Sequence, residues 1–514
     1  MSGDSEQLPL LDDHTPGPEG TLGRMGLAAL TLNFIFGAGV VGIPYAFEQG
    51  GLVVSVLTLG LCAMFALMSM LWLVEVQSRG QAWVLARQAD AYSGIEINAG
   101  GSAAAPRPLT LPLITDSPRT PALRGSGHMQ YTLGKECIEL SSLTGIFLSK
   151  TGQRVYTISL MLYMLSASWA YGAITSVSFA ETFPLTFITG DIACNMSQVT
   201  GALWLVPTPC WMGYLVYLFG FLVVILILMS LKTAWMQRFQ MCLTLYGLSM
   251  IFAMIFTAAI ALPEHFDAAK LRANTSVIFN FKGFGTVFGS FVFSQLVHMG
   301  VPTLTHVAKD KGSIKSTFVV VISFACVLYM SLGILSVLLF DSLGENKIEK
   351  VITLNWADYT TGGKHKAFAR VLSNMIRLFP VATCSAGFAL YALTLSNSLF
   401  QVMPESVLQW RTFRGKSGER RLQTVLKTMC IVLPCSLAAI LSNVAIIMSV
   451  VGLSGFVIAY FTPLFLQLRS QEMCQRKFGS SRTPYDSFIS SPTYCYACLA
   501  FASLSLLYSI YNLF

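Results

Sequence analysis

Long apolar runs, each about the length of a membrane-crossing helix, recur along the whole sequence. A helix rises about 1.5 Å per residue, so roughly 20 apolar residues cross the hydrocarbon core of a bilayer. Of the 514 residues, 54% are hydrophobic and only 11% are charged, which is typical of a polytopic membrane protein and not of a soluble domain. We count eleven candidate spans, at residues 24–47, 51–73, 155–180, 211–231, 239–262, 283–305, 316–340, 367–400, 422–441, 443–466 and 493–514.

The first span carries an unusual density of helix-breaking residues. Gly37, Gly39, Gly42 and Pro44 all fall within one short stretch of it. Glycine loosens a helix and proline removes a backbone donor, whereas a freed backbone group in lipid costs several kcal/mol. The pattern therefore indicates one of two things: a small-residue face for close helix packing, or a broken backbone that faces protein, water or a ligand.

The sixth span favours the second interpretation. It again combines glycines, Pro302 and polar side chains such as Gln295 and His298 in an apolar setting. It lies five spans after the first, so the two cross the membrane in opposite directions, as a five-plus-five inverted repeat requires. Interrupted helices at matching positions of two halves indicate a transporter's central binding site. Unwound half-helices offer N–H and C=O groups that suit an amino acid zwitterion without burying a full protein charge.

Basic residues predict the orientation of the spans. Lys and Arg cluster in alternate loops, which places the N-terminus in the cytosol and, with an odd number of spans, the C-terminus in the lumen. The two glycosylation sequons, at Asn195 and Asn274, then fall in loops on the lumenal side. Cys194 and Cys210 share one of these loops, and an oxidising lumen permits a disulfide between them.

The composition divides the chain into four parts. Residues 1–23 form a cytosolic tail, and residues 24–74 hold the first two spans. Residues 75–154 are predicted to form a cytosolic loop that is largely disordered, because much of it is rich in Ala, Gly, Pro, Ser and Thr without apolar periodicity. Spans three to eleven occupy residues 155–514. Glu75, at the end of the second span, is interpreted as an interfacial charge.

The N-terminal tail contains a candidate sorting signal. Glu6, Leu10 and Leu11 match the spacing of the acidic dileucine signal, which cytosolic adaptor proteins read on the route to endosomes, lysosomes or vacuoles. A chance match in a short pattern is the alternative. The sequence thus favours an endolysosomal or vacuolar membrane, with the plasma membrane as the other location.

The first-span motif resembles that of the amino acid/auxin permease family. The family pattern N-x-x-x-G-x-G-x-x-G, followed by a hydrophobic residue, Pro or Ser, Tyr, Ala and Met or Phe, is met at residues 33–47. Residues 298–304 look most like the transmembrane protein 104 branch, and residues 451–455 with Pro463 are similar to the family's tenth helix. The resemblance implies an all-α LeuT-like fold with an extra C-terminal helix, and cation-coupled amino acid transport.

Carried over by position, the resemblance also implies a site. Backbone donors of the first break would bind the substrate carboxylate, and backbone carbonyls of the sixth span would meet its amine. The implied substrate-binding residues are Gly37, Ala38, Gly39, Val40, Gly42, Phe291, Phe293 and Ser294. An asparagine of the first span and a hydroxyl of the eighth would hold sodium, whereas a histidine suits proton coupling. The implied ion-coupling residues are Asn33, Thr383 or Ser385, and His298.

The leading hypothesis is a secondary active transporter of small amino acids, driven by a proton or sodium gradient. The alternative is a sensor or scaffold that binds an amino acid in the same pocket and signals through the cytosolic loop. The sequence shows no nucleotide-binding loop, metal-ligand cluster or nucleophile motif, so an enzyme is not expected. Apart from the coupling ion, we expect no cofactor. The expected partners are the amino acid, the membrane and adaptor proteins at the tail, with no nucleic acid.

Overall fold

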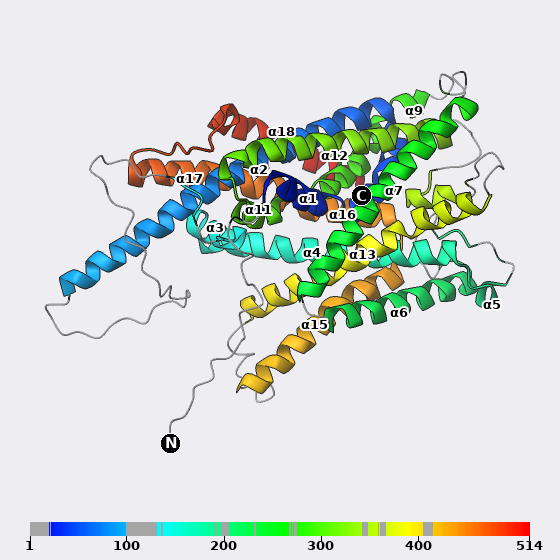
Figure 1. Ribbon diagram of the computed structural model, residues 1–514, viewed down its shortest axis with the longest axis horizontal. Helices are drawn as coiled ribbons and strands as arrows, with labels where there is room; N and C mark the ends of the chain where they lie inside the picture. Colours follow the sequence, from blue (N-terminus) through cyan, green and yellow to red (C-terminus); the bar gives the residue numbers. More distant parts are fainter. Residues whose placement is uncertain are drawn as a thin grey trace.

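The chain folds as a bundle of long helices. The computed structural model describes residues 20, 22–98, 131–134, 137–190, 192, 194–196, 205–230, 233–266, 269, 271, 275–341, 348–357, 359, 366–403 and 415–513. Most of the long helices lie along the longest dimension of the molecule (Figure 1). In chain order the elements, with η for 3₁₀ or π segments, are α1 (Arg24–Ile35), η1 (Ala38–Gly42), α2 (Ile43–Asn98), α3 (Leu140–Phe147), α4 (Ser149–Thr182), α5 (Thr186–Thr189), α6 (Thr208–Ser230), α7 (Thr233–His265), α9 (Thr275–Ile278), η3 (Phe281–Gly283), α10 (Phe284–Ser294), η4 (His298–Gly300), α11 (Val301–Val307), η5 (Lys311–Ser313), α12 (Ile314–Ser336), η6 (Val337–Asp341), η7 (Ile352–Trp356), α13 (Lys366–Val402), α15 (Gly415–Ile440), α16 (Val444–Phe456), η8 (Val457–Phe461), α17 (Thr462–Phe478), η9 (Phe488–Ser490) and α18 (Pro492–Leu513).

Ten helical segments in the described residues are long and apolar enough to cross a membrane. These are Gly39–Gln88, Ser149–Thr182, Thr208–Ser230, Cys242–Glu264, Phe281–Val307, Lys311–Phe340, Lys366–Phe400, Gly418–Ile440, Val444–Phe478 and Pro492–Tyr511. The predicted class of all-α polytopic membrane protein is thereby confirmed. The count of eleven spans and the inverted repeat stay predictions.

The longest of these segments contains a sharp break in its backbone. Gly51 has φ 70° and ψ 165° inside α2, in the left-handed region that glycine adopts without steric cost. A Cβ at this position would lie only 2.8 Å from the carbonyl oxygen of Ser276 and 2.9 Å from the amide nitrogen of Phe279. Glycine is therefore required here, where the first predicted span passes into the second.

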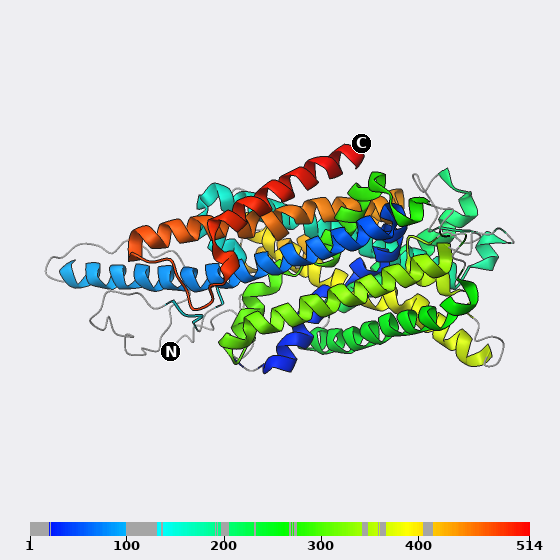
Figure 2. The ribbon, with the colours of Figure 1, turned by 90° about the horizontal axis from the view of Figure 1, so that it is seen from above.

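The part of α2 after Gly51 is longer than the second span predicted from the sequence. The helix runs on to Asn98, well past residue 73, where the second span was predicted to end. Part of the range 75–154, predicted as a largely disordered loop, is thus helical, and 99–130 lie outside the described residues. Residues 74–82 are polar in part yet buried, because partners from distant parts of the chain cover them. Figure 2 shows α2 beside α17 beyond the ends of the other helices.

A short parallel backbone pairing ties the start of α1 to the end of α11. The amide of Leu22 donates to the carbonyl of Val307 over 3.0 Å, and the amide of Lys309 donates to the carbonyl of Leu22 over 2.9 Å. At the other end of α1, η1 contacts α4, α10, α13 and α16. The first interrupted helix is thus placed at the centre of the bundle.

Candidate functional site

The first predicted interruption is present between α1 and η1. Phe36 leaves the helix with ψ 73°, and Gly37 follows in an extended conformation with φ −106° and ψ −157°. The amide of Gly37 turns back to the carbonyl of Ile35 over 2.9 Å. A tight 3₁₀ segment from Ala38 to Gly42 follows before α2 begins. The break therefore comes where glycines allow it, as the sequence indicated.

The second predicted interruption lies between α10 and η4. The helix ends at Ser294, and regular geometry resumes only at His298. Within the gap, the amide of Val297 donates to the carbonyl of Gln295 over 3.1 Å. The sixth span is therefore built from two half-helices, α10 and α11.

The two breaks touch each other. A Cβ built on Gly39 would come within 2.6 Å of the Cα of Ser294, closer than any side chain can approach a backbone. Around this contact Val40, Phe291 and Phe293 are buried. The hydroxyl of Ser294 donates to the carbonyl of Phe291 over 2.9 Å, within its own helix. The two sets of predicted substrate-binding residues thus meet at Gly39 and Ser294.

A tyrosine that sequence analysis did not single out bridges the two broken ends. The hydroxyl of Tyr329, on α12, donates to the carbonyl of Ile35 over 3.1 Å and reaches the carbonyl of Ser294 at 3.5 Å. Its position inside an apolar span was the available signal, because a buried tyrosine hydroxyl usually finds a partner.

An aromatic cluster lies against the first break. The rings of Tyr171 on α4 and Tyr391 on α13 stack with centroids 5.5 Å apart, and Tyr163 packs edge-on to Tyr391 at 5.9 Å. Phe293 of α10 adjoins Tyr163, with ring centroids 6.4 Å apart. The Tyr171 hydroxyl lies 3.4 Å from where a Cβ on Gly37 would be. The cluster therefore brings phenol hydroxyls, which both donate and accept hydrogen bonds, next to the broken backbone.

The predicted ion-coupling residues lie in two places: Asn33 on α1 with Thr383 and Ser385 on α13, and His298 in the second break. The Asn33 carboxamide oxygen accepts a hydrogen bond from the hydroxyl of Thr244 on α7. Thr383 lies against the same helix, because its methyl group is 3.4 Å from where a Cβ on Gly247 would be. Ser385 donates to a carbonyl of its own helix over 2.7 Å. The hydroxyl of Thr383 likewise donates to carbonyls of its own helix over 3.2 Å, so its contact with α7 is made by the methyl group.

His298, the predicted proton-coupling residue, lies in the second break. Its side chain is buried, and Nε2 is 2.6 Å from the hydroxyl oxygen of Ser69 on α2. Its other ring nitrogen, Nδ1, has no hydrogen-bond partner in the described part of the chain. The ring is therefore anchored on one side only.

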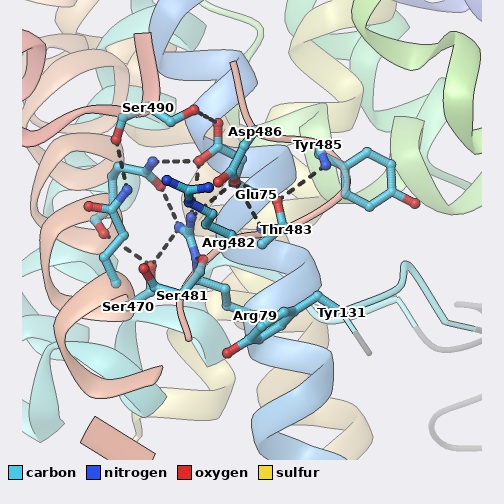
Figure 3. Close-up of polar contacts among 12 residues, drawn as sticks. Glu75, Arg79, Tyr131, Ser470, Ser481, Arg482, Thr483, Tyr485, Asp486 and Ser490 are labelled. Atoms are coloured by element: carbon cyan, nitrogen blue, oxygen red, sulfur yellow. Dashed lines mark hydrogen bonds and ion pairs between the residues drawn. The ribbon is translucent and has the colours of Figure 1, made fainter. Parts of the chain in front are cut away.

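A buried charged cluster lies on α2, on the side where it meets α17 and the segment before α18 (Figure 3). The guanidinium of Arg79 is fully buried and uses Nε, Nη1 and Nη2 as donors. It donates to Ser481 O at 2.9 Å, Gln467 Oε1 at 2.8 Å, Ser470 Oγ at 3.2 Å, Glu75 Oε2 at 3.1 Å and Asp486 Oδ1 at 3.5 Å. Four of these five partners are remote in sequence, and the fifth, Glu75, lies one turn away on the same helix.

Glu75 belongs to this cluster, so its interpretation as an interfacial charge was wrong. Its carboxylate is fully buried and pairs with Arg79. It also accepts hydrogen bonds from Gln467 Nε2 at 2.6 Å and from the hydroxyl of Ser490. A buried carboxylate is tolerated because the ion pair and these donors replace its hydration.

Comparison with known proteins gives a family match over the first break. The family described as transmembrane amino acid transporter protein matches residues 22–106, which include α1, η1 and all of α2. A transmembrane protein 104 homolog from Caenorhabditis briggsae is 22% identical, covering 76% of this chain and 70% of the relative. The homolog from Drosophila melanogaster is 21% identical over 87% and 88%, and that from Dictyostelium discoideum is 20% identical over 92% and 93%.

These matches confirm the predicted family resemblance. The three relatives cover 76%, 87% and 92% of the chain, and the part that the family description matches is the part that carries the first break and its contact with Ser294. The residues that match a transporter family thus include the residues that form the first break.

Of the remaining predicted features, the disulfide lies within the described residues, the glycosylation sequons lie there in part, and the sorting signal lies outside them. Cys194 and Cys210 are joined in a disulfide, with their Cα atoms 5.6 Å apart. Asn195 is exposed, and its carboxamide nitrogen donates to Glu349 over 3.3 Å. The second sequon, at Asn274, and the sorting signal at Glu6, Leu10 and Leu11 lie outside the described residues.

Proposed function

We propose that the protein is a secondary active transporter of small amino acids that works by alternating access around its two broken helices. The observation that carries the proposal is the contact between Gly39 and Ser294, which joins two interrupted membrane helices in a chain related to amino acid transporters. Discontinuous helices that meet near the centre of a bundle are the usual setting of a transporter's substrate site.

The substrate is a zwitterion held mainly by backbone groups. The free N–H groups at the start of η1 carry partial positive charge and suit a carboxylate, whereas the carbonyls at the end of α10 carry partial negative charge and suit an ammonium group. Because neither pole needs an oppositely charged side chain, the site avoids the cost of a lone charge in mid-membrane. The phenol hydroxyls of Tyr171 and Tyr391 lie beside the first break and complete the polar lining.

The proposal includes a LeuT-like arrangement with eleven crossings. The break at Gly51 supports the count of eleven. If the chain reverses there, the longest apolar segment contains the end of the first crossing and the whole of the second. In this arrangement the N-terminus is cytosolic, the C-terminus is lumenal, and the protein resides in an endolysosomal or vacuolar membrane. Adaptor proteins would bind the N-terminal tail.

The driving ion is a proton or sodium. The oxygens of Asn33 and Thr244, with Thr383 against the same helix, support a sodium site between α1, α7 and α13. The buried imidazole of His298, which has one unpaired nitrogen, supports proton coupling. The two sites are separate, so variants at each distinguish the two ions.

The test is uptake of a radiolabelled amino acid mixture into proteoliposomes of the purified protein, under separate proton and sodium gradients. Uptake that follows one gradient is expected and would name the ion. Binding of an amino acid without uptake under either gradient would contradict the transporter. It would favour a sensor instead, a second candidate function supported by the part of α2 after Gly51, which runs from the bundle into the predicted cytosolic loop.

A further inference from the structure

The contacts of Ser69 indicate the tautomer of the neutral His298 ring. The Ser69 hydroxyl oxygen lies 2.8 Å from the carbonyl of Phe65, 3.1 Å from that of Ala66 and 2.6 Å from Nε2 of His298. A hydroxyl has one proton to donate, and both carbonyls accept only. If the proton goes to a carbonyl of the helix, the imidazole must donate from Nε2 to the Ser69 oxygen.

The opposite assignment leaves a buried donor without an acceptor. Were Ser69 to donate to Nε2, the ring proton of a neutral imidazole would sit on Nδ1. Nδ1 has no partner among the described residues, and His298 is only 1% exposed. Buried orphaned N–H groups are rarer than underused acceptors. The geometry therefore places the proton on Nε2 and leaves the lone pair of Nδ1 free.

A second buried side chain in the same break also lacks partners. Gln295 is three residues before His298 and is 4% exposed, yet neither its Oε1 nor its Nε2 has a hydrogen-bond partner in the described part of the chain. Each unsatisfied buried polar group costs about 1–3 kcal/mol, so such atoms persist where a ligand, an ion or water uses them during function. The break in the sixth span thus holds an unused base and an unused acceptor.

We propose that Nδ1 of His298 is the atom that binds the coupling proton and that Ser69 is the positioning residue for the ring. The inference rests on the proposed transport function. A proton from water on the acidic side adds to the Nδ1 lone pair, and the imidazole becomes an imidazolium with one more positive charge. The Ser69 oxygen keeps Nε2–H throughout. Release of the same proton to water on the other side restores the neutral ring.

The charged and titratable groups on the neighbouring elements include a second buried histidine, His306 of α11, whose ring nitrogens also lack partners in the described residues; His298 differs from it in lying within the break between α10 and α11. The elements packed against η4 are α2, α11 and η8. Near Ser69, α2 carries Cys62, Glu75 and Arg79; α11 carries His306, and η8 carries Tyr460. Glu75 and Arg79 pair with each other, and Tyr460 hydrogen-bonds with Cys62.

The first experiment measures proton-driven uptake against pH in proteoliposomes. Ser69→Ala removes the acceptor for Nε2–H, so we expect the midpoint of the pH profile to move about one pH unit toward acid, as for the loss of one hydrogen bond to a charged group. Ser69→Thr keeps a hydroxyl and should restore the profile. His298→Gln should abolish the pH dependence, and His306→Gln should keep it. Ser78→Ala is the matched control, because it removes another buried hydroxyl from the same helix.

A profile for Ser69→Ala that matches the wild type, or one that moves equally in Ser78→Ala, would overturn the positioning role.

A second readout does not need transport. In ¹⁵N-histidine-labelled protein, the His298 signal, identified by its loss in His298→Gln, should report a neutral ring protonated on Nε2 and should acquire a second proton on acidification. A ring protonated on Nδ1, or one that never titrates, would refute the inference even if uptake is proton-driven. Absence of any gradient-driven uptake in the wild type would instead refute the proposed function.

Discussion

The hydroxyl of Tyr329 donates to the main-chain carbonyl of Ile35 over 3.1 Å, at the residue where α1 ends. The same hydroxyl lies 3.5 Å from the carbonyl of Ser294, where α10 ends. The last carbonyls of a helix have no partner within it. One side chain from a third helix therefore supports the carboxyl ends of both broken helices.

Replacing this hydroxyl should weaken the site more than the fold. We expect Tyr329→Phe to lower the free energy of unfolding by about 0.5–1.5 kcal/mol, the usual net contribution of a hydrogen bond, and to reduce amino acid uptake. Tyr217→Phe is the control, because the Tyr217 hydroxyl also donates to a backbone carbonyl, that of Phe183, but away from the breaks. Thermal unfolding in detergent and uptake check both effects. Equal uptake in the two variants would contradict the bridging role.

Gly39 should tolerate no side chain. A Cβ there would lie 2.6 Å from the Cα of Ser294, so Gly39→Ala must push the two breaks apart. Overpacking of this kind costs about 1–3 kcal/mol, and we expect uptake to fall about tenfold or more. Gly60→Ala is the matched control on α2, since its nearest neighbour would be the end of the flexible Met330 side chain at 3.6 Å. A Gly39→Ala protein that transports like Gly60→Ala would rule out the close contact.

The Arg79 cluster should show strong coupling between its charges. Arg79→Met alone leaves the buried carboxylate of Glu75 without its counter-ion, which typically costs about 3–5 kcal/mol. Glu75→Leu combined with Arg79→Met removes both charges, so we expect the double variant to be more stable than Arg79→Met. Thermal unfolding of the single and double variants gives the coupling free energy. Additive effects would indicate that the pair does not interact across its 3.1 Å separation.

The disulfide between Cys194 and Cys210 is directly testable. We expect neither thiol to react with a maleimide in denatured, unreduced protein, and both to react after reduction. Mass spectrometry of the labelled peptides separates these cysteines from the others. Labelling of both without reductant would show that the bond is absent. Asn195, next to Cys194, should carry glycan in cells, which a shift in mass after deglycosylation would detect.

Alkylation of Cys137 should depend steeply on pH. Burial raises the pKa of the Cys137 thiol to about 11, and the neighbouring carboxylate of Glu139 acts in the same direction. The thiolate is the reactive form, and a raised pKa leaves only about one molecule in ten thousand as thiolate at pH 7. We therefore expect the labelling rate in folded protein to rise about tenfold per pH unit from pH 7 to 10, with Cys137→Ser identifying the site. A rate that levels off near pH 9 would contradict the raised pKa.

Both breaks could be predicted from the sequence because they are local properties of the chain. Gly37 and Gly39 permit the first break, and the glycines and Pro302 of the sixth span mark the second. The all-helical membrane class followed from apolar run length alone. The contact of the Thr383 methyl group with α7 could not be predicted, since it depends on which face of α13 meets α7, and the choice between Thr383 and Ser385 as the ion-coupling hydroxyl stays a prediction.

The length of α2 and the Arg79 cluster could not be predicted in this way. Polar residues after the second apolar run look like the start of a loop, because their partners are not adjacent in sequence. Gln467 and Asp486 lie nearly four hundred residues beyond Arg79, and only tertiary packing brings them to it. The role of Tyr329 was missed for the same reason, since its acceptors belong to two other helices.

The backbone hydrogen bonds that join Leu22 to Val307 and Lys309, at the end of α11, have a mechanical consequence. α1 is fastened at its start to Val307 and Lys309, and at its end, through Tyr329, to the carbonyl of Ser294. The two halves of the sixth span are thus linked to opposite ends of one short rod of twelve residues. A displacement of α1 therefore either moves α11 as well or breaks the two amide hydrogen bonds of Leu22. Tension on the N-terminal tail would thus reach the second break as well as the first.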